Sequence, residues 1–175
     1  MLAISCMIFT TVCNAQSEKK AVFALDMTSL AMNKSKLKAG NMKLSPAYQH
    51  LLEVADKTLG KNKIYTVMEK KQTPPSGDMH DYMSLAIYYW PDPEKSNGLP
   101  YIRKDGQINP EVETYKDKAN ISNMMNDVTT LSLAYYFSDD TKYSKKAIEQ
   151  LRAWFLDPKT KMNPNFNFAQ AIKGK

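Results

Sequence analysis

The feature of this sequence that most restricts its fold is a pair of apolar stripes at helical spacing near the carboxyl end. They predict helices over residues 120–137 and 143–156, joined by a turn at Asp139-Asp140. The positions expected to face inward are Ile121, Met124, Met125, Val128, Leu131, Ser132, Tyr135, Ala147, Ile148, Leu151, Trp154 and Phe155. Because the connection is short, the two helices should pack antiparallel as a hairpin.

Two further helices are predicted upstream of this hairpin. The first is expected over residues 29–39, with Asp26 or Thr28 as its cap. The second should begin at Ser45-Pro46, where a capping hydroxyl precedes a proline in the first turn, and should end at Gly60. The helical content of the chain is therefore expected to be high.

Long loops separate the predicted helices. Residues 61–75 are polar, residues 82–89 suit a strand or a packed loop, and residues 91–110 hold four prolines and two glycines, which predicts a loop throughout. Helical hairpins joined by long, aromatic-rich loops are typical of an all-α (α/α) toroid or incomplete barrel, in which loops at one end build a cleft. The sequence therefore predicts this fold class.

The amino terminus has the pattern of an export signal. Residues 1–12 are apolar and uncharged, and Cys13-Asn14-Ala15 resembles a cleavage site, so residues 1–15 are expected to be a signal peptide. A short buried helix or strand is the alternative. With a signal, residues 16–175 form the mature domain, free of cysteine and located outside the cell or in the periplasm. The apolar run is too short to span a membrane.

The charge of the chain indicates what kind of partner it binds. The net charge is +6, which favours an acidic partner: nucleic acid, an anionic membrane surface or a polyanionic polysaccharide. The lysines are dispersed, and no nucleic-acid-binding motif or zinc pattern is present, so nucleic acid is disfavoured. The two histidines are too few and too far apart in sequence to indicate a metal centre, and no cofactor motif is found.

The first candidate binding group is His80-Asp81-Tyr82. Histidine is a natural proton shuttle near neutral pH, and the adjacent carboxylate of Asp81 is expected to orient it. The phenol of Tyr82 adds an oriented hydrogen-bonding group. The alternative is that His80 is a structural histidine bonded to a backbone carbonyl.

The second group is the aromatic run that includes Tyr89 and Trp90, with Pro91 directly after it. Consecutive side chains cannot all face a core, because they alternate along a strand. At least one ring should therefore enter a space built by loops, where its flat face can stack on a sugar. The alternative is an apolar plug beneath the following loop.

The third group holds primary amides, at Asn163, Asn165 and Gln170. Amides donate and accept hydrogen bonds at once, which suits hydroxyls and carboxylates of a polar ligand. The alternation of Asn163, Asn165 and Asn167 places them on one face if the segment is extended. Turn formation is the alternative, since asparagine is common in turns.

Several motifs together resemble the alginate lyase family of secreted bacterial polysaccharide lyases. They are Pro74-Pro75-Ser76-Gly77-Asp78, His80-Asp81-Tyr82-Met83-Ser84, Tyr89-Trp90-Pro91-Asp92-Pro93, Gly98-Leu99-Pro100-Tyr101-Ile102-Arg103, Asp105-Gly106, Asn109-Pro110-Glu111, Ala134-Tyr135-Tyr136-Phe137, Trp154-Phe155-Leu156-Asp157-Pro158, Met162-Asn163-Pro164-Asn165 and Phe168-Ala169-Gln170. The resemblance implies an (α/α) toroid and β-elimination of uronic-acid polymers. It also implies a catalytic tyrosine helped by histidine and arginine, which are expected beyond Lys175, so that this chain corresponds to the amino-terminal part of such a lyase.

The resemblance and the composition lead to two alternative functions. The first is a lyase, or its amino-terminal part, that cleaves alginate-like or glucuronan-like polymers without a metal. The second is a non-catalytic module that binds an acidic glycan. The expected substrate-binding residues are His80, Tyr82, Tyr89, Trp90, Asn163, Asn165 and Gln170.

Overall fold

The computed structural model describes residues 24–175, and the signal peptide expected at residues 1–15 lies outside them. The described chain forms two compact units, residues 24–41 and 42–175. The first unit holds α1 (Met27–Lys38), which begins at Asp26, whose carboxylate accepts a hydrogen bond from the Thr28 amide at 2.9 Å. The cap expected at Asp26 is confirmed, and the helix begins two residues earlier than predicted.

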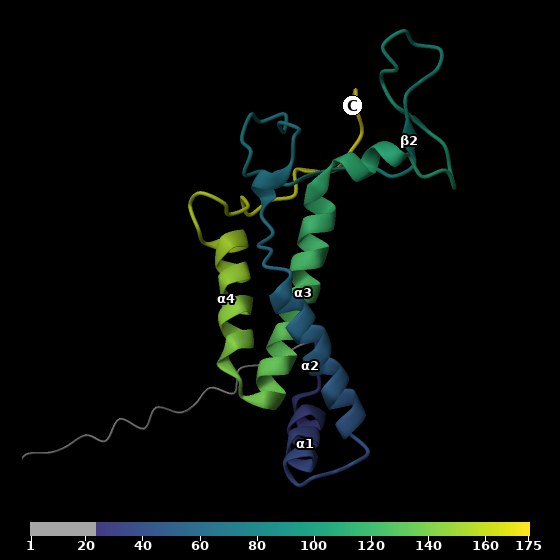
Figure 1. The fold of residues 1–175 in the computed structure, drawn as a ribbon. Helices are drawn as coiled ribbons and strands as arrows, with labels where there is room; N and C mark the ends of the chain where they lie inside the picture. Colours follow the sequence, from purple (N-terminus) through teal and green to yellow (C-terminus); the bar gives the residue numbers. More distant parts are fainter. Residues whose placement is uncertain (1–23) are drawn as a thin grey trace, which may run out of the picture. The chain divides into compact units, whose positions relative to one another are not determined.

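Three long helices form the body of the second unit. They are α2 (Ser45–Gly60), α3 (Lys116–Ser138) and α4 (Thr141–Phe155), and Figure 1 shows α3 and α4 antiparallel and side by side. Asp139 adopts a left-handed conformation with φ 59°, and Asp140 caps α4 by accepting a hydrogen bond from the Lys142 amide. The predicted helical hairpin is confirmed.

The start of α2 differs from the prediction. Ser45 is the first residue of the helix rather than its cap, because the first helical bond runs from the Tyr48 amide to the carbonyl of Leu44. Leu44 has no side-chain oxygen, so this helix begins without a side-chain cap. Its end at Gly60 is as predicted.

The inward faces of the hairpin were predicted only in part. One buried cluster joins Ala55 of α2 to Leu131 and Ala134 of α3 and to Tyr143 and Ala147 of α4. The predictions were wrong for six residues, which are exposed: Met125, Ser132, Tyr135, Ile148, Leu151 and Phe155. Neighbouring helix positions differ by about 100°, so residues beside the buried stripe turn outward when only one side is covered.

A polar residue occupies the buried stripe of α4 where an apolar one was expected. Gln150 is 2% exposed, and its side chain accepts a hydrogen bond from the Tyr65 amide at 2.9 Å and donates one to the Tyr65 carbonyl at 2.7 Å. The Gln150 side chain thus satisfies both backbone hydrogen-bonding groups of Tyr65, which lies in a loop and not in a strand. This is why Gln150 is buried while Leu151 is not.

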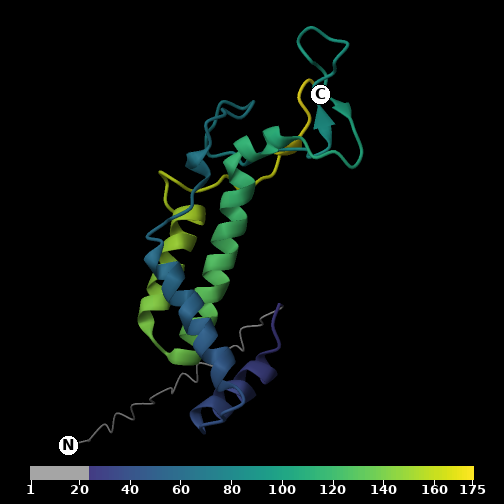
Figure 2. The same cartoon turned by 45° about the vertical axis from the view of Figure 1, so that its right-hand side comes forward.

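Short strands and long loops surround the end of the helices where α3 begins and α4 ends (Figure 1 and Figure 2). β1 (Met83–Leu85) pairs in parallel with β4 (Phe168–Ala171), and β2 (Tyr89–Trp90) pairs antiparallel with β3 (Ile102–Arg103). The 3-10 turns η1 (Val67–Glu69) and η2 (Pro110–Thr114) complete the unit. β3 lies within residues 91–110, which were predicted as loop throughout, and that prediction was wrong at this point.

A second buried cluster joins this loop region to the helices. Val67, Tyr82 and Met162 pack against Met124 of α3 and Trp154 of α4, and Trp154 is completely buried. The loops are therefore attached to the helical body by apolar contacts, which gives the side chains near them a fixed position. The chain is rich in helix, as the sequence predicts, with short strands added at this end.

Candidate functional site

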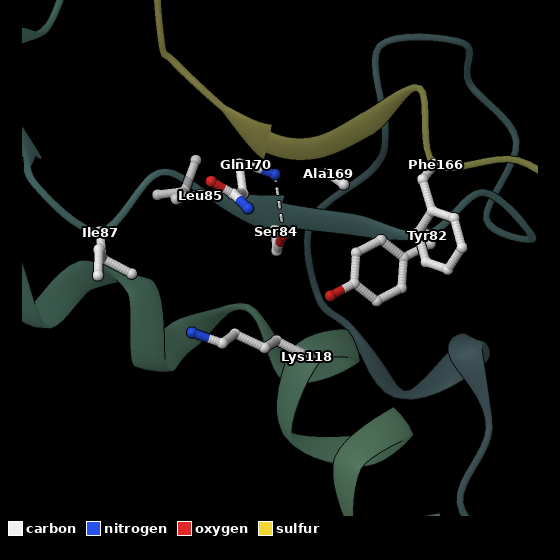
Figure 3. Close-up of a pocket in the computed structure, with 8 residues that line it drawn as sticks. All are labelled: Tyr82, Ser84, Leu85, Ile87, Lys118, Phe166, Ala169 and Gln170. Carbon is white, nitrogen blue, oxygen red and sulfur yellow. Dashed lines mark hydrogen bonds between the residues drawn. The ribbon is translucent and has the colours of Figure 1, made fainter. Parts of the chain in front are cut away.

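A pocket of about 210 Å³ lies between the β1–β4 pair and the first turn of α3. Figure 3 shows its lining residues, which are Tyr82, Ser84, Leu85, Ile87, Lys118, Phe166, Ala169 and Gln170. The lining combines apolar faces with a few hydrogen-bonding groups, which is the usual composition of a small-molecule site.

Tyr82 and Phe166 form the aromatic end of the pocket. Their rings meet edge to face, with centroids 5.0 Å apart, and Tyr82 is buried. Burial raises the pKa of the Tyr82 phenol, and the nearby Ser84 hydroxyl offsets part of this effect. The phenol therefore stays protonated at neutral pH, where it can donate a hydrogen bond but is a poor base.

Gln170 reaches the pocket because the β1–β4 pairing is irregular. Met83 pairs with Phe168 and Leu85 pairs with Ala171, so β4 holds one more residue than β1 over the same stretch. Gln170 takes a left-handed conformation with φ 51°, and its backbone N–H donates to the Ser84 hydroxyl at 3.0 Å. This bulge presents the Gln170 side chain to the pocket, and bulges of this kind often serve to redirect a side chain at a site.

A buried carboxylate organises the chain beside the pocket. Asp81 accepts hydrogen bonds from the Ser76 hydroxyl at 2.6 Å, the Asn163 amide at 2.8 Å and the Asn165 amide at 3.1 Å. These bonds, that of Ser76 first, hold the pKa of Asp81 below its usual value. Asp81 directly precedes Tyr82, and Asn165 directly precedes Phe166, so the network determines where both pocket rings lie.

Both N–H groups of the Asn163 side chain are used within this network. Its amide group donates to Asp78 at 2.9 Å as well as to Asp81, which uses both of its N–H bonds. The Asn165 side chain uses one N–H for Asp81, and its oxygen accepts a hydrogen bond from the backbone N–H of Asn167. Of the two asparagines, Asn165 therefore keeps one donor for a ligand, and Asn163 keeps none.

His80 is held by a backbone carbonyl rather than by the neighbouring carboxylate. Its Nδ1 lies 2.6 Å from the carbonyl oxygen of Lys161, which can only accept, so Nδ1 carries the proton. In the neutral ring, Nε2 then keeps its lone pair and can accept a proton. The expectation that Asp81 orients His80 was wrong, because Asp81 is bonded to Ser76, Asn163 and Asn165.

Tyr89 and Trp90 lie on the β2–β3 hairpin and do not line the pocket. The Trp90 indole N–H donates to the Gln107 carbonyl at 2.9 Å, and the Lys104 ammonium lies 5.7 Å from the Trp90 ring centroid. The Lys175 ammonium lies at the same distance from the Tyr89 ring. Both rings are half-buried, so this hairpin forms a separate aromatic surface with cations on it.

The structure thus divides the residues predicted from sequence into three places. Tyr82 and Gln170 line the pocket, and Asn163 and Asn165 belong to the adjoining network. His80 is joined to that network through its backbone N–H, which donates to Asp78 at 2.8 Å, and Tyr89 and Trp90 lie on the hairpin. Sequence reasoning missed the other six lining residues: Ser84, Leu85, Ile87, Lys118, Phe166 and Ala169. Lys118 was missed because α3 was expected to begin at residue 120. The helix α3 in fact begins at Lys116. The residue before it is Tyr115, whose side chain makes no capping hydrogen bond, so the sequence carries no signal for this start.

A profile of the alginate lyase family matches residues 66–174, which contain the pocket, the network and the hairpin. The chain belongs to the alginate lyase family. The crystal structure of an alginate lyase from Bacteroides ovatus is similar, with 51% identity and a TM-score of 0.76. The match covers 85% of the present chain and 38% of the Bacteroides protein, so the chain spans well under half the length of that alginate lyase. No curated protein sequence matches.

Within residues 24–175, histidine and carboxylate side chains form no group of three or more that could hold a metal ion. No helix in the same stretch is both long enough and apolar enough to cross a membrane.

Proposed function

We propose that this chain acts in the β-elimination of uronic-acid polymers, as a polysaccharide lyase on alginate-like or glucuronan-like substrates. Membership of the alginate lyase family supports the reaction class. The observation that carries the proposal is the pocket, in which two aromatic rings, a protonated phenol and a free amide side chain meet. Aromatic faces and donors in one small space suit a single polar sugar ring.

The reaction sets clear chemical requirements. A base removes the proton on the carbon next to the uronate carboxylate, the electron pair forms a carbon–carbon double bond, and the glycosidic oxygen leaves and takes up a proton. The first proton is weakly acidic unless the carboxylate is neutralised or hydrogen-bonded. Donors that face the sugar therefore matter as much as the base.

The predicted site residues take different roles in this proposal. The Tyr82 phenol and the Gln170 amide donate to the sugar in the pocket, and the remaining N–H of Asn165 is available beside it. Asn163 holds the loop in place through Asp78 and Asp81, rather than binding the substrate itself. His80 supplies an imidazole nitrogen with a free lone pair, and Tyr89 and Trp90 offer stacking faces for sugars further along the chain.

A second function, binding of an acidic glycan without cleavage, is favoured by one feature of the site. Burial raises the pKa of the Tyr82 phenol, so this lining group donates a hydrogen bond rather than takes a proton. Under this alternative the same pocket and hairpin hold the polymer, and no double bond forms. The two functions share their binding residues and differ in their product.

The proposal extends to the architecture and location of the protein. We place the α2–α3–α4 body within an (α/α) toroid, because antiparallel helical hairpins are the repeating unit of that fold. We also propose that the protein is secreted or periplasmic, which agrees with an extracellular polymeric substrate and with the apolar segment at residues 1–12.

One experiment separates the two functions. The chain is incubated with alginate and with glucuronan while ultraviolet absorbance is recorded. The product of elimination absorbs ultraviolet light, because its new double bond is conjugated to the carboxylate. Binding of each polymer is measured in parallel by calorimetry. Absorbance that grows with time supports the lyase, and binding without it supports the module. If neither polymer binds or reacts, both functions are refuted.

Two histidine variants provide a matched comparison in this experiment. His80→Ala should weaken binding or turnover, while His50→Ala should not, because His50 lies exposed on α2 beside Glu53 and far from the pocket in sequence. Equal behaviour of the two variants would remove His80 from the site.

A further inference from the structure

We propose that Lys118 binds the carboxylate of a uronate ring in the pocket and selects acidic sugars over neutral ones. This inference rests on the proposed function and names the side chain that would bind the negatively charged group of the substrate. Lys118 lies in the first turn of α3, and Figure 3 shows its side chain extending along the α3 side of the pocket.

The ammonium of Lys118 is available for a ligand. Within residues 24–175 it forms no ion pair or hydrogen bond, and its side chain is exposed. Four lysines of the same unit are instead paired with carboxylates: Lys61 with Asp127, Lys63 with Glu69, Lys70 with Asp117, and Lys173 with Glu111. A cation that is unpaired beside a pocket is available to an anionic ligand.

No carboxylate lines the pocket to compensate this charge. Lys118 is the single charged residue among the eight that line it. The preceding residue, Asp117, is completely buried and already bonded to Lys70 and to the Met83 amide. Lys118 also borders a second hollow that includes Glu113, and no ion pair joins the two side chains. The pocket therefore carries a net positive charge, which favours an anionic ligand.

The size and chemistry of the pocket agree with one uronate ring. Its volume of about 210 Å³ is below the range of about 300–1,000 Å³ usual for drug-sized ligands, so it suits one ring rather than several. Tyr82 and Phe166 provide apolar faces, while Ser84 and Gln170 provide polar atoms for hydroxyls. Lysine adds a compact charge with three donors on a flexible stem, which fits a carboxylate at the edge of the ring.

The test compares an acidic with a neutral sugar chain of the same linkage. The probes are a β-1,4-linked glucuronate tetramer and cellotetraose, which differ in the carboxylates. Lys118→Met keeps the length of the side chain and removes its charge, Lys118→Arg keeps the charge, and Lys145→Met removes one charge from an exposed site on α4. Affinities are measured by calorimetry, and melting temperatures confirm that each variant is folded.

We expect Lys118→Met to weaken binding of the glucuronate tetramer about tenfold to a hundredfold, as for loss of a charged hydrogen bond. Its affinity for cellotetraose should equal that of the parent, Lys118→Arg should retain most of the affinity for the acidic tetramer, and Lys145→Met should change neither. Acetylation of lysines followed by peptide mass spectrometry should show that the tetramer protects Lys118 and leaves Lys145 reactive.

Each failure has a distinct meaning. If the parent binds the glucuronate tetramer and Lys118→Met binds it equally well, the inference is overturned and the proposed function stands. If Lys145→Met loses as much affinity as Lys118→Met, general charge attraction explains the result and the inference is again overturned. If the parent binds no oligouronate, the proposed function fails and this inference fails with it.

Discussion

The buried ion pair between Lys70 and Asp117 should make a large contribution to stability. The Lys70 ammonium lies 2.9 Å from the Asp117 carboxylate and 2.6 Å from the Val67 carbonyl, and both side chains are at least 99% buried. Asp117 also accepts a hydrogen bond from the Met83 amide at 2.9 Å. One carboxylate thus joins η1, the first turn of α3 and the start of β1, which leads to the pocket.

The free energy of unfolding should fall sharply when one partner is removed. Lys70→Met leaves the Asp117 carboxylate buried without its cation, which costs about 3–5 kcal/mol. One oxygen of Asp117 already has no partner within the described chain, so little remains to compensate the charge. Burial raises the pKa of Asp117, so part of the loss is relieved if the carboxyl takes up a proton.

Replacing both partners should be milder than replacing one. Lys70→Met with Asp117→Leu removes both charges and leaves mainly the Met83 amide without a partner, at a cost of about 1–3 kcal/mol. The double variant should therefore be more stable than either single variant. This order distinguishes an ion pair from two independent packing contacts, whose losses would add.

Urea unfolding followed by tryptophan fluorescence measures these differences, because Trp154 is completely buried. Lys61→Met is the matched control, since Lys61 pairs with Asp127 at 2.7 Å but its side chain is 46% exposed. That variant should lose at most about 1 kcal/mol. The reasoning is refuted if Lys70→Met loses less than the control, or if the losses of the two single variants add in the double variant.

Three further predictions concern the network and the hairpin. Hydrogen bonds lower the pKa of Asp81 in the folded protein below the value near 3.8 of the unfolded chain. The stability that these bonds provide is therefore fully present at pH values above the unfolded pKa, and it is lost as the pH falls through the folded pKa. Asp81→Asn should therefore flatten the acid side of a plot of melting temperature against pH, and an unchanged slope would contradict this. Asn163→Asp should lower the melting temperature without ligand more than Asn163→Ala does, because it sets a third carboxylate against Asp78 and Asp81, and equal values would rule out the repulsion. Trp90→Ala should weaken binding of polyuronates about tenfold in calorimetry while Phe155→Ala, at an exposed ring on α4, changes nothing; equal effects would assign Trp90 a structural role.

The helical hairpin could be predicted because its determinants are local. Apolar spacing within a helix and a two-residue turn between Asp139 and Asp140 depend on residues close in sequence. The direction of each buried face was harder to predict, since Gln150 is buried only because Tyr65, distant in sequence, needs a partner for its backbone. Residue type alone favoured Leu151, which is exposed.

The candidate site could be predicted as a set of residues but not as an arrangement. The polar-aromatic composition around His80-Asp81-Tyr82 and Asn163–Gln170 indicates a polar ligand from residue types alone. Residue types do not show that the Asn163 amide is already used by two carboxylates, or that the Lys161 carbonyl holds His80.

The sequence by itself determined the helical body, the resemblance to a family of lyases and most of the polar groups near the site. Only the tertiary structure decided which of them meet. β1 and β4 pair across about 85 residues, and this pairing, together with the first turn of α3, places Lys118 beside Tyr82 and Gln170. Local periodicity carries no information on such pairings, because their free energy comes from contacts that exist only when distant segments are folded together.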